Sequence, residues 1–400
     1  MHSGKTFISI NLGNFGSTGA IMHGIGALVE QKGYDCYYIY PKSRLMKAKD
    51  NHDIIACSLI NRKIAENLAY FTGFRGIWLA ASTWRVLIKI KKLSPTVIHL
   101  HNLHNTFIHL PLLFNYCKKH KIKVIWTLHD CWPFTGQCPH FTMEKCDKWR
   151  TGCHDCPQID VYPSSCVDRT KIMWRLKKKW FTGVKDMTLV APSQWLAELV
   201  GKSFLKDYPV KVIHNGIDLS VFKPTESDFR KKYGVLETKF ILLGVAFSWS
   251  LRKGMDVFID LSKRLEPEKY QIVLVGTDDK VDKQLSDNII SIHRTQNQRE
   301  LIEIYTAADL FLNPTREENY PTVNMESIAC GTPVLTFRTG GSPEMLDETC
   351  GSVVERDDID TLEREIIRIS TERPYSKEAC LERAKIFDKD RRFQEYINLL

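Results

Sequence analysis

The chain has 400 residues, of which 43% are hydrophobic and 26% are charged, and its formal net charge is +9 at pH 7. This composition is typical of a globular protein with two domains and excludes a disordered or fibrous chain. No apolar run approaches the ~18 residues of a membrane-spanning helix. The positive charge favours an acidic partner, such as a nucleotide-linked substrate, an anionic membrane or a nucleic acid.

The N-terminal stretch has the alternation of a parallel α/β domain. It predicts a strand over residues 7–12, a glycine loop, a helix over 20–32 and a second strand over 35–40. The loop glycines, among them Gly16 and Gly19, lack the GxGxxG spacing of a dinucleotide site. They predict a tight turn, and backbone N–H groups there could also approach a phosphate or a sugar. No signal-peptide features are present, so we expect a cytoplasmic protein with reduced thiols.

Residues 61–92 mix aromatic and apolar side chains with cations, and they predict helices whose apolar faces are edged by positive charge. Two interpretations stay open. The helices could simply cover a sheet with their apolar faces. They could also form a surface for anionic lipid, where tryptophan and basic residues are favoured.

Histidines accompany the next two predicted strands, over 96–100 and 124–128. His99 and His101 fall on one strand face, and no acidic or cysteine partner stands at a usual zinc spacing beside them. We therefore favour polar lining of a cleft between two domains over a metal site. His129 stands at the carboxyl end of the second strand, where it could either donate a hydrogen bond to a ligand or cap the following loop.

Cysteines are concentrated in residues 131–166. Cys153 and Cys156 form a C-x2-C half-site, and Cys138 and Cys146 precede it. Four thiolates at about 2.3 Å around one Zn²⁺ would stabilise a loop that has almost no core of its own. A reducing compartment argues against two disulfides. Four unligated thiols remain the alternative.

The rest of the chain repeats the α/β alternation. A basic helix is predicted over 168–184, and strands are predicted over 187–191, 210–213, 239–246, 270–275 and 288–292. Arg252 and Lys253 follow the strand over 239–246. The last residues predict a pair of helices, and the second of these covers 388–400.

Residues 309–346 read as strand, loop, helix, strand, loop and helix, which is the order of a parallel sheet. Ligands of such sheets bind beyond the carboxyl ends of the strands, where helix N-termini offer N–H groups to phosphates. Glu318 stands in the loop before the helix and Glu326 lies within the helix, with Val323 and Asn324 between them. The two acids could flank a bound phosphate, or they could be ordinary solvated acids.

The spacing Glu318-x7-Glu326, followed by Ser-Ile-Ala-Cys-Gly-Thr-Pro-Val, resembles the signature of the retaining GT-B glycosyltransferases of the large group 1 family. Gly-Gly-Ser-Pro-Glu at 340–344, Asn-Gly-Ile-Asp at 215–218 and Lys253-Gly254 resemble further motifs of that family. The resemblance implies that Glu318 contacts the transferred sugar and that Glu326 holds the ribose hydroxyls. It also implies that Lys253 pairs with the donor diphosphate.

Further roles follow from the same resemblance. His129 would lie near the donor sugar, the glycine loop with Gly16 and Gly19 would face the donor, and Val323 and Asn324 would contact the nucleotide. The family usually has an arginine where this chain has Phe247, so Arg252 is the expected substitute. The cysteine-rich insert resembles that of one bacterial branch of the family.

The resemblance implies an α/β fold of the GT-B type, with two Rossmann-like domains facing a cleft. We expect an acceptor-side domain over 1–205 that carries the insert 131–166 and receives the final helix, 388–400. A domain that binds the nucleotide sugar would cover 206–387.

The expected activity is the transfer of a hexosyl group from a UDP- or GDP-sugar to a sugar or lipid-linked acceptor. It would retain configuration, use no catalytic metal and serve polysaccharide biosynthesis. We expect a cytoplasmic protein, peripheral on the inner face of the plasma membrane, with no nucleic-acid partner. The alternatives are a nucleotide-sugar epimerase of the same architecture and a zinc-stapled nucleic-acid-binding protein.

Overall fold

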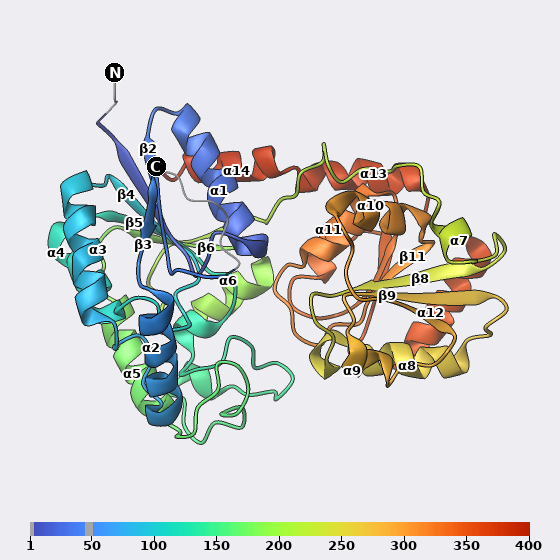
Figure 1. The fold of residues 1–400 in the computed structure, drawn as a ribbon, viewed down its shortest axis with the longest axis horizontal. Helices are drawn as coiled ribbons and strands as arrows, with labels where there is room; N and C mark the ends of the chain where they lie inside the picture. Colours follow the sequence, from blue (N-terminus) through green and yellow to red (C-terminus); the bar gives the residue numbers. More distant parts are fainter. Residues whose placement is uncertain (1–3, 45–50) are drawn as a thin grey trace. The chain divides into compact units, whose positions relative to one another are not determined.

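The computed structural model describes residues 4–44 and 51–400, and its chain divides into two compact units (Figure 1). Unit 1 contains the residues up to His214 together with Arg392–Leu400, and unit 2 is Asn215–Arg391. The start of the predicted first domain, residues 1–3, lies outside the described residues.

The predicted boundary after residue 205 is nine residues too early for the division after His214. The physical reason is a short strand, β7 (Val210–Val212), which pairs in parallel with β6 (Met187–Ala191) and so extends the sheet of unit 1. The segment between residue 205 and His214 therefore belongs to the first unit.

Unit 1 is built on a parallel sheet, whose apolar strands are covered by helices and therefore lie in a buried core. The further strands are β1 (Thr6–Ile10), β2 (Asp35–Tyr40), β3 (Asp53–Ile55), β4 (Val97–Leu100) and β5 (Lys123–Thr127). Their order is β3-β2-β1-β4-β5-β6-β7. The helices are α1 (Gly16–Gln31), α2 (Leu59–Thr72), α3 (Ala80–Leu93), α4 (Leu110–His120), α5 (Thr170–Phe181) and α6 (Gln194–Gly201).

The final helix, α14 (Lys389–Ile397), carries the chain back into unit 1, to which Arg392–Leu400 belong. Figure 1 shows it in red beside the blue α1. The ring of Phe393 packs so closely on Gly24 that a Cβ atom there would come within 2.4 Å of it. The hydroxyl of Tyr396 lies 3.1 Å from that of Thr127 in β5. These two aromatic anchors fix the end of the chain on the first sheet.

Unit 2 has the second parallel sheet, in the order β10-β9-β8-β11-β12-β13. Its strands are β8 (Phe240–Val245), β9 (Tyr270–Val275), β10 (Ile289–Ile292), β11 (Leu310–Asn313), β12 (Val334–Phe337) and β13 (Gly351–Val354). Its helices are α7 (Phe229–Lys232), α8 (Met255–Arg264), α9 (Asp279–Asp282), α10 (Gln298–Ala307), α11 (Thr322–Ala329), α12 (Ile359–Glu372) and α13 (Lys377–Ala384).

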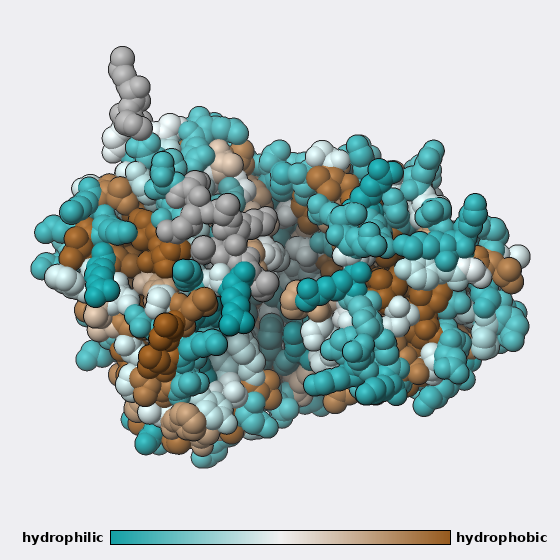
Figure 2. Space-filling view, viewed as in Figure 1, coloured by the Kyte–Doolittle hydropathy of each residue, from teal (hydrophilic) through white to brown (hydrophobic). Residues whose placement is uncertain are grey.

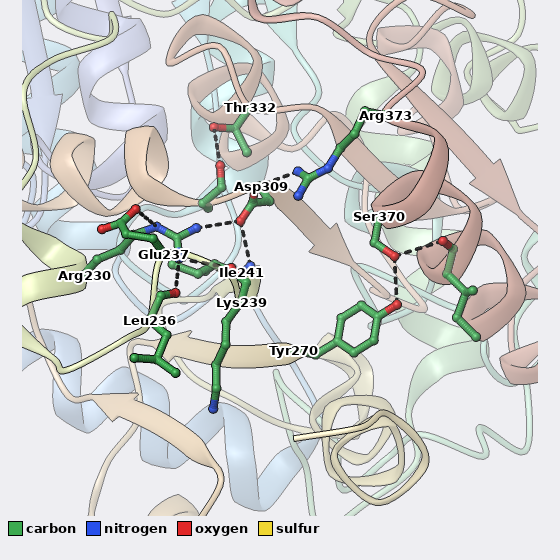
Figure 3. Close-up of polar contacts among 12 residues, drawn as sticks. Arg230, Leu236, Glu237, Lys239, Ile241, Tyr270, Asp309, Thr332, Ser370 and Arg373 are labelled. Atoms are coloured by element: carbon green, nitrogen blue, oxygen red, sulfur yellow. Dashed lines mark hydrogen bonds and ion pairs between the residues drawn. The ribbon is translucent and has the colours of Figure 1, made fainter. Parts of the chain in front are cut away.

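A polar network secures the amino end of β11, at the edge of the sheet opposite to its carboxyl-end loops (Figure 3). One carboxylate oxygen of Asp309 accepts hydrogen bonds from the backbone N–H of Ile241, at 2.8 Å, and from Arg230, at 2.9 Å. The other accepts from Arg373 at 2.7 Å. Since every partner belongs to the scaffold of unit 2, this cluster holds β8 and β11 together.

Each sheet has one point where the strand order reverses, between β1 and β4 in unit 1 and between β8 and β11 in unit 2. Loops leaving such neighbouring strands turn in opposite directions and open a crevice at the carboxyl edge, which is where ligands bind in this class of sheet. In unit 2 this crevice lies beside the residues that follow β8 and β11.

Candidate functional site

The loops that follow β8, β11 and β12 pack on one another in unit 2. The backbone N–H of Arg316 donates to the carbonyl oxygen of Arg252 at 2.8 Å, and the N–H of Gly341 donates to that of Asn319 at 2.6 Å. Gly340 has a φ of +55°, and a Cβ atom there would lie 1.8 Å from the carbonyl oxygen of Glu318. Only glycine permits this approach, so the Gly-Gly motif sets the position of the Glu318 loop.

Lys253 and Glu318 form an ion pair at the meeting point of these loops. The ammonium nitrogen of Lys253 lies 2.6 Å from a carboxylate oxygen of Glu318, and the two side chains are 22% and 21% exposed. Arg252 also contacts this loop, since its guanidinium donates to the carbonyl oxygen of Glu317 at 3.3 Å. Lysine, arginine and the predicted sugar-facing acid are thus brought together beyond the carboxyl ends of β8 and β11.

Arg316 has a structural role in the same loop. Its guanidinium makes a two-pronged contact with Asp256, at 2.7 Å for each bond, and a further bond to Asp357 at 2.6 Å. These carboxylates raise the pKa of Arg316 above its usual value. Arg316 therefore clamps the loop to the start of α8, while Phe247 is 90% exposed and offers no charge.

Glu326 lies on α11 in a half-buried position rather than on an open helix surface. Its carboxylate accepts a hydrogen bond from the hydroxyl of Tyr305 at 3.1 Å and another from Thr322. Burial raises the pKa of this carboxyl to about 7, although the two hydrogen bonds act in the opposite direction. A partly desolvated acid held by two hydroxyl groups is well suited to accept hydrogen bonds from a diol.

The two residues between the acids are not equivalent. Asn324 is fully buried, and its side-chain oxygen accepts from the amide of Asn313 in β11 at 2.7 Å. Its side chain is thus engaged inside unit 2, because the helix turns this position toward the sheet. Val323 is partly buried against the same core.

In unit 1, the glycine loop belongs to the first turn of α1. This helix begins at Gly16, where φ is +69°, and not near residue 20 as predicted. The residue before it, Phe15, provides no side-chain cap. A Cβ atom at Gly19 would lie 2.7 Å from the backbone carbonyl carbon of Asn14, so a residue with a side chain does not fit at this position. An uncapped first turn offers N–H groups to an anion.

The histidines that follow β4 and β5 are packed against each other. His101 Nδ1 lies 3.1 Å from His129 Nε2, and His99 bonds the hydroxyl of Thr127 at 2.9 Å. Burial lowers the pKa of His99 to about 3 and that of His129 to about 4, so both rings are neutral at pH 7. His99 and His101 are 0% and 1% exposed, which corrects the expectation that they line a cleft.

His129 is half-buried, and the residue after it, Asp130, accepts from His104 at 3.2 Å. The other ring nitrogen of His104 bonds the hydroxyl of Tyr162 at 3.0 Å. No motif in the sequence indicates this chain of hydrogen bonds. His109 has a different task, because its ring accepts from the backbone N–H of Leu112 and caps α4.

All four predicted metal-ligating cysteines, Cys138, Cys146, Cys153 and Cys156, line one cavity of about 20 Å³ in unit 1. Each is a free thiol of intermediate exposure. The segment that carries them contains only two short 3-10 helices, η1 (Trp132–Phe134) and η2 (Lys148–Arg150).

The basic and apolar stretch 61–92 forms α2 and α3, and its side chains divide between the interior and the surface. Arg75 is buried and donates to the carbonyl oxygen of Ser164, and Arg62 pairs with Glu66. The exposed part lies on α2 and α3, and Figure 2 shows brown side chains over α2. We call this the α2–α3 surface, which consists of Ile60, Lys63, Ile64, Leu68, Phe71, Trp84, Arg85, Ile88 and Lys89. Within the described ranges, no helix is both long and apolar enough to span a bilayer.

Tyr305 and Thr322, the partners of Glu326, were not predicted from the sequence. Thr322 stands four residues before Glu326, and residues at this spacing are neighbours on a helix, so the sequence does contain a signal for this contact. Tyr305 comes from α10, and nothing local in the sequence connects it with the acid.

Two family models match most of the chain between them. The model described as Glycosyltransferase Family 4 matches residues 25–221, and the model described as Glycosyl transferases group 1 matches residues 238–372. The second match contains Lys253, Glu318 and Glu326.

Among curated relatives, the chain is similar to the colanic acid biosynthesis glycosyl transferase WcaC of Escherichia coli K12, with 27% identity over 275 residues. That alignment covers 66% of this chain and 65% of WcaC, just under two thirds of the relative's length.

Solved structures with a similar fold include sucrose-phosphate synthase from Thermosynechococcus elongatus, with a TM-score of 0.72 and 16% identity over 99% of this chain and 98% of that chain. HepE from Anabaena, in complex with UDP-glucose, has a TM-score of 0.66 and 15% identity over 98% of each chain.

Proposed function

This chain is a glycosyltransferase of the group 1 family with the GT-B fold, and from that premise we propose that it transfers a sugar from a nucleoside-diphosphate donor with retention of configuration. The acceptor would be a sugar or a lipid-linked saccharide. The observation that supports this proposal best is the Lys253–Glu318 pair, at 2.6 Å, beyond the carboxyl ends of β8 and β11.

The proposed donor site uses three side chains of unit 2 for three parts of the donor. Lys253, with Arg252 close to it, would bind the diphosphate, whose negative charge grows as the bond to the sugar breaks. Glu326 would accept hydrogen bonds from the ribose hydroxyls. Glu318 would face the sugar ring, where positive charge develops, and need not form a covalent bond with it.

Unit 1 would supply contacts of a different kind. The first turn of α1, with Gly16 and Gly19, has uncapped N–H groups suited to a phosphate or sugar oxygen. His129 is neutral at pH 7 because its pKa is about 4, so it can donate a hydrogen bond to a sugar hydroxyl without adding charge. Both assignments rest on the environment of each residue within its own unit.

The donor is proposed to be a UDP- or GDP-sugar and the process to be polysaccharide biosynthesis in bacteria. HepE in its complex with UDP-glucose supports the first of these, and the colanic acid assignment of WcaC supports the second. The α2–α3 surface combines exposed apolar and basic side chains. We therefore propose peripheral binding to the anionic inner face of the plasma membrane, where a lipid-linked acceptor is available.

A panel of nucleotide sugars in a thermal-shift assay tests the donor class. A ligand at 100 times its dissociation constant stabilises the folded protein by ~2.7 kcal/mol, so a UDP- or GDP-sugar should raise the melting temperature and related nucleotides should not. Incubation of that donor with saccharide acceptors should then give a product whose anomeric configuration, read by NMR, matches the donor. Turnover of donor without acceptor would instead indicate an epimerase.

A further inference from the structure

We propose that Cys138, Cys146, Cys153 and Cys156 bind one structural Zn²⁺ ion in unit 1, independently of sugar transfer. The four thiols line a single cavity whose walls also include the side chains of Phe141 and Trp149. The other three cysteines lie close enough to Cys138 to interact with it electrostatically. Four sulfur ligands in tetrahedral geometry are the usual set of a structural zinc site.

The backbone around the cysteines has the turns and donors that a metal–thiolate site needs. Lys145 and Asp155, each just before a cysteine, adopt left-handed conformations with φ of +48° and +40°. Such turns bring the following cysteine back toward the cavity. The backbone N–H of Gly136 already donates to the sulfur of Cys153 at 3.1 Å. A hydrogen bond to sulfur stabilises a thiolate more than a neutral thiol.

A buried lysine stands beside these cysteines. Lys177 is fully buried, donates to the carbonyl oxygen of Trp132, and interacts electrostatically with Cys138 and Cys153. It belongs to the basic helix predicted over 168–184, and α5 turns this position inward. Burying an ammonium group without negative charge nearby is costly. Four thiolates around Zn²⁺ carry a net charge of −2 and would compensate it.

A second polar group near the cavity lacks a partner. The indole N–H of Trp149 is buried, with no hydrogen-bond partner, and the residue lines the cavity of the four thiols. With uncharged thiols or two disulfides, the negative charge acting on Lys177 would come from Asp130. A zinc–thiolate centre supplies both negative charge for Lys177 and sulfur acceptors for N–H donors.

Zinc binding would draw the four sulfur atoms together. Within residues 4–44 and 51–400, the ligand atoms of the exposed group Asp279, Asp282 and His293 all lie within 4.8 Å of one another. No three of the four thiol sulfurs are that close together. A tetrahedral site with Zn–S bonds of ~2.3 Å places the sulfurs about 3.8 Å apart. The segment has no regular element longer than a 3-10 turn, so it can contract.

The binding step involves no change of oxidation state. Zn²⁺ enters, four thiols release four protons to solvent, and four Zn–S bonds form. The affinity should therefore fall as the pH is lowered, because protons compete with the metal for the sulfurs.

The experiment uses the full chain, purified under reducing conditions without added metal. Elemental analysis should find about one zinc per chain. After removal by a chelator, one equivalent of Co²⁺ should produce the intense sulfur-to-metal charge-transfer band and the visible bands of tetrahedral Co²⁺ bound by thiolates. Cys153→Ser should lower the zinc content and weaken these bands, whereas Cys166→Ser, at an exposed cysteine outside the cluster, should leave both unchanged.

Lys177→Met tests the proposed role of the buried charge. It should weaken zinc binding by about 10–100-fold, the range found for residues that surround a metal site. Since the Co²⁺ spectrum is recorded on the wild-type chain, a variant that fails to fold does not affect the main test. A wild-type protein with four titratable thiols and no metal, or with two disulfides by mass spectrometry, would overturn the proposal.

Discussion

The ammonium group of Lys253 lies 2.6 Å from the carboxylate of Glu318, although the two residues come from loops after different strands. Both side chains are about one fifth exposed, at 22% and 21%. A donor diphosphate that binds Lys253 must therefore compete with Glu318 for the cation. We propose that this exchange frees the carboxylate of Glu318 to face the sugar at the moment when the diphosphate is held.

Replacing Lys253 by alanine should impair both chemistry and donor binding. The cation opposes a negative charge that increases in the transition state, so kcat should fall by about 10²-fold or more. Steady-state kinetics with varied donor measures both effects. Lys263→Ala is the matched control, because Lys263 is exposed on α8, and its kinetics should equal those of the wild type.

Glu318→Gln keeps the size of the side chain and removes its charge. We expect a lower kcat with little change in the affinity for the free nucleotide, because the carboxylate acts on charge that develops in the sugar. Single-turnover rates and nucleotide titration separate the two quantities. Normal turnover would make Glu318 an ordinary loop acid, whereas Glu268→Gln, at an exposed site, should have no effect in either case.

Glu326→Ala should act mainly on the donor KM. Hydrogen bonds to the ribose exist in the ground state and in the transition state alike, so their loss should weaken binding by ~1.5–3 kcal/mol, or about 10–150-fold in KM. An equal loss in kcat with unchanged KM would contradict the assignment to the ribose.

Glu326 should also make stability depend on pH. Burial raises its pKa from 4.5 to about 7, so the buried neutral carboxyl is favourable below pH 4.5 and this contribution is lost as the pH rises toward 7. Glu326→Gln has no such titration. Its free energy of unfolding relative to the wild type should therefore increase between pH 5 and 8 by up to about 3 kcal/mol. Urea unfolding at both pH values measures it, and parallel curves would refute a raised pKa.

The α2–α3 surface should bind anionic vesicles and release them as salt rises, because its basic residues are screened. Sedimentation with anionic and neutral vesicles measures this. Charge reversal of Lys63 and Lys89, both exposed, should reduce binding, and Trp84→Ala should reduce it further. Reversal of Lys231 and Lys263 in unit 2 is the control with the same change in net charge. Equal binding to neutral vesicles, or none, would leave the helices as ordinary covering elements.

The sequence by itself determined the fold class and the main candidate residues. Strand, loop and helix alternate along the chain, and a parallel sheet built in that way puts each βα loop at the same edge. Local motifs therefore placed Lys253 after one strand and Glu318 after another without any knowledge of distances. The cysteine spacing was equally local. The return of the final helix was implied by the family resemblance, and its aromatic anchors on unit 1 are known only from the structure.

Only the tertiary structure decided which partners meet and which charges are buried. The contact of Lys253 with Glu318, and that of Tyr305 with Glu326, join residues from different elements. Strand order brings them together, and no local pattern encodes it. Burial is likewise a property of packing, because the core of unit 1 encloses Lys177 and His101 although polar side chains usually face water. Desolvation in that core then determines their charge and the partners that they need.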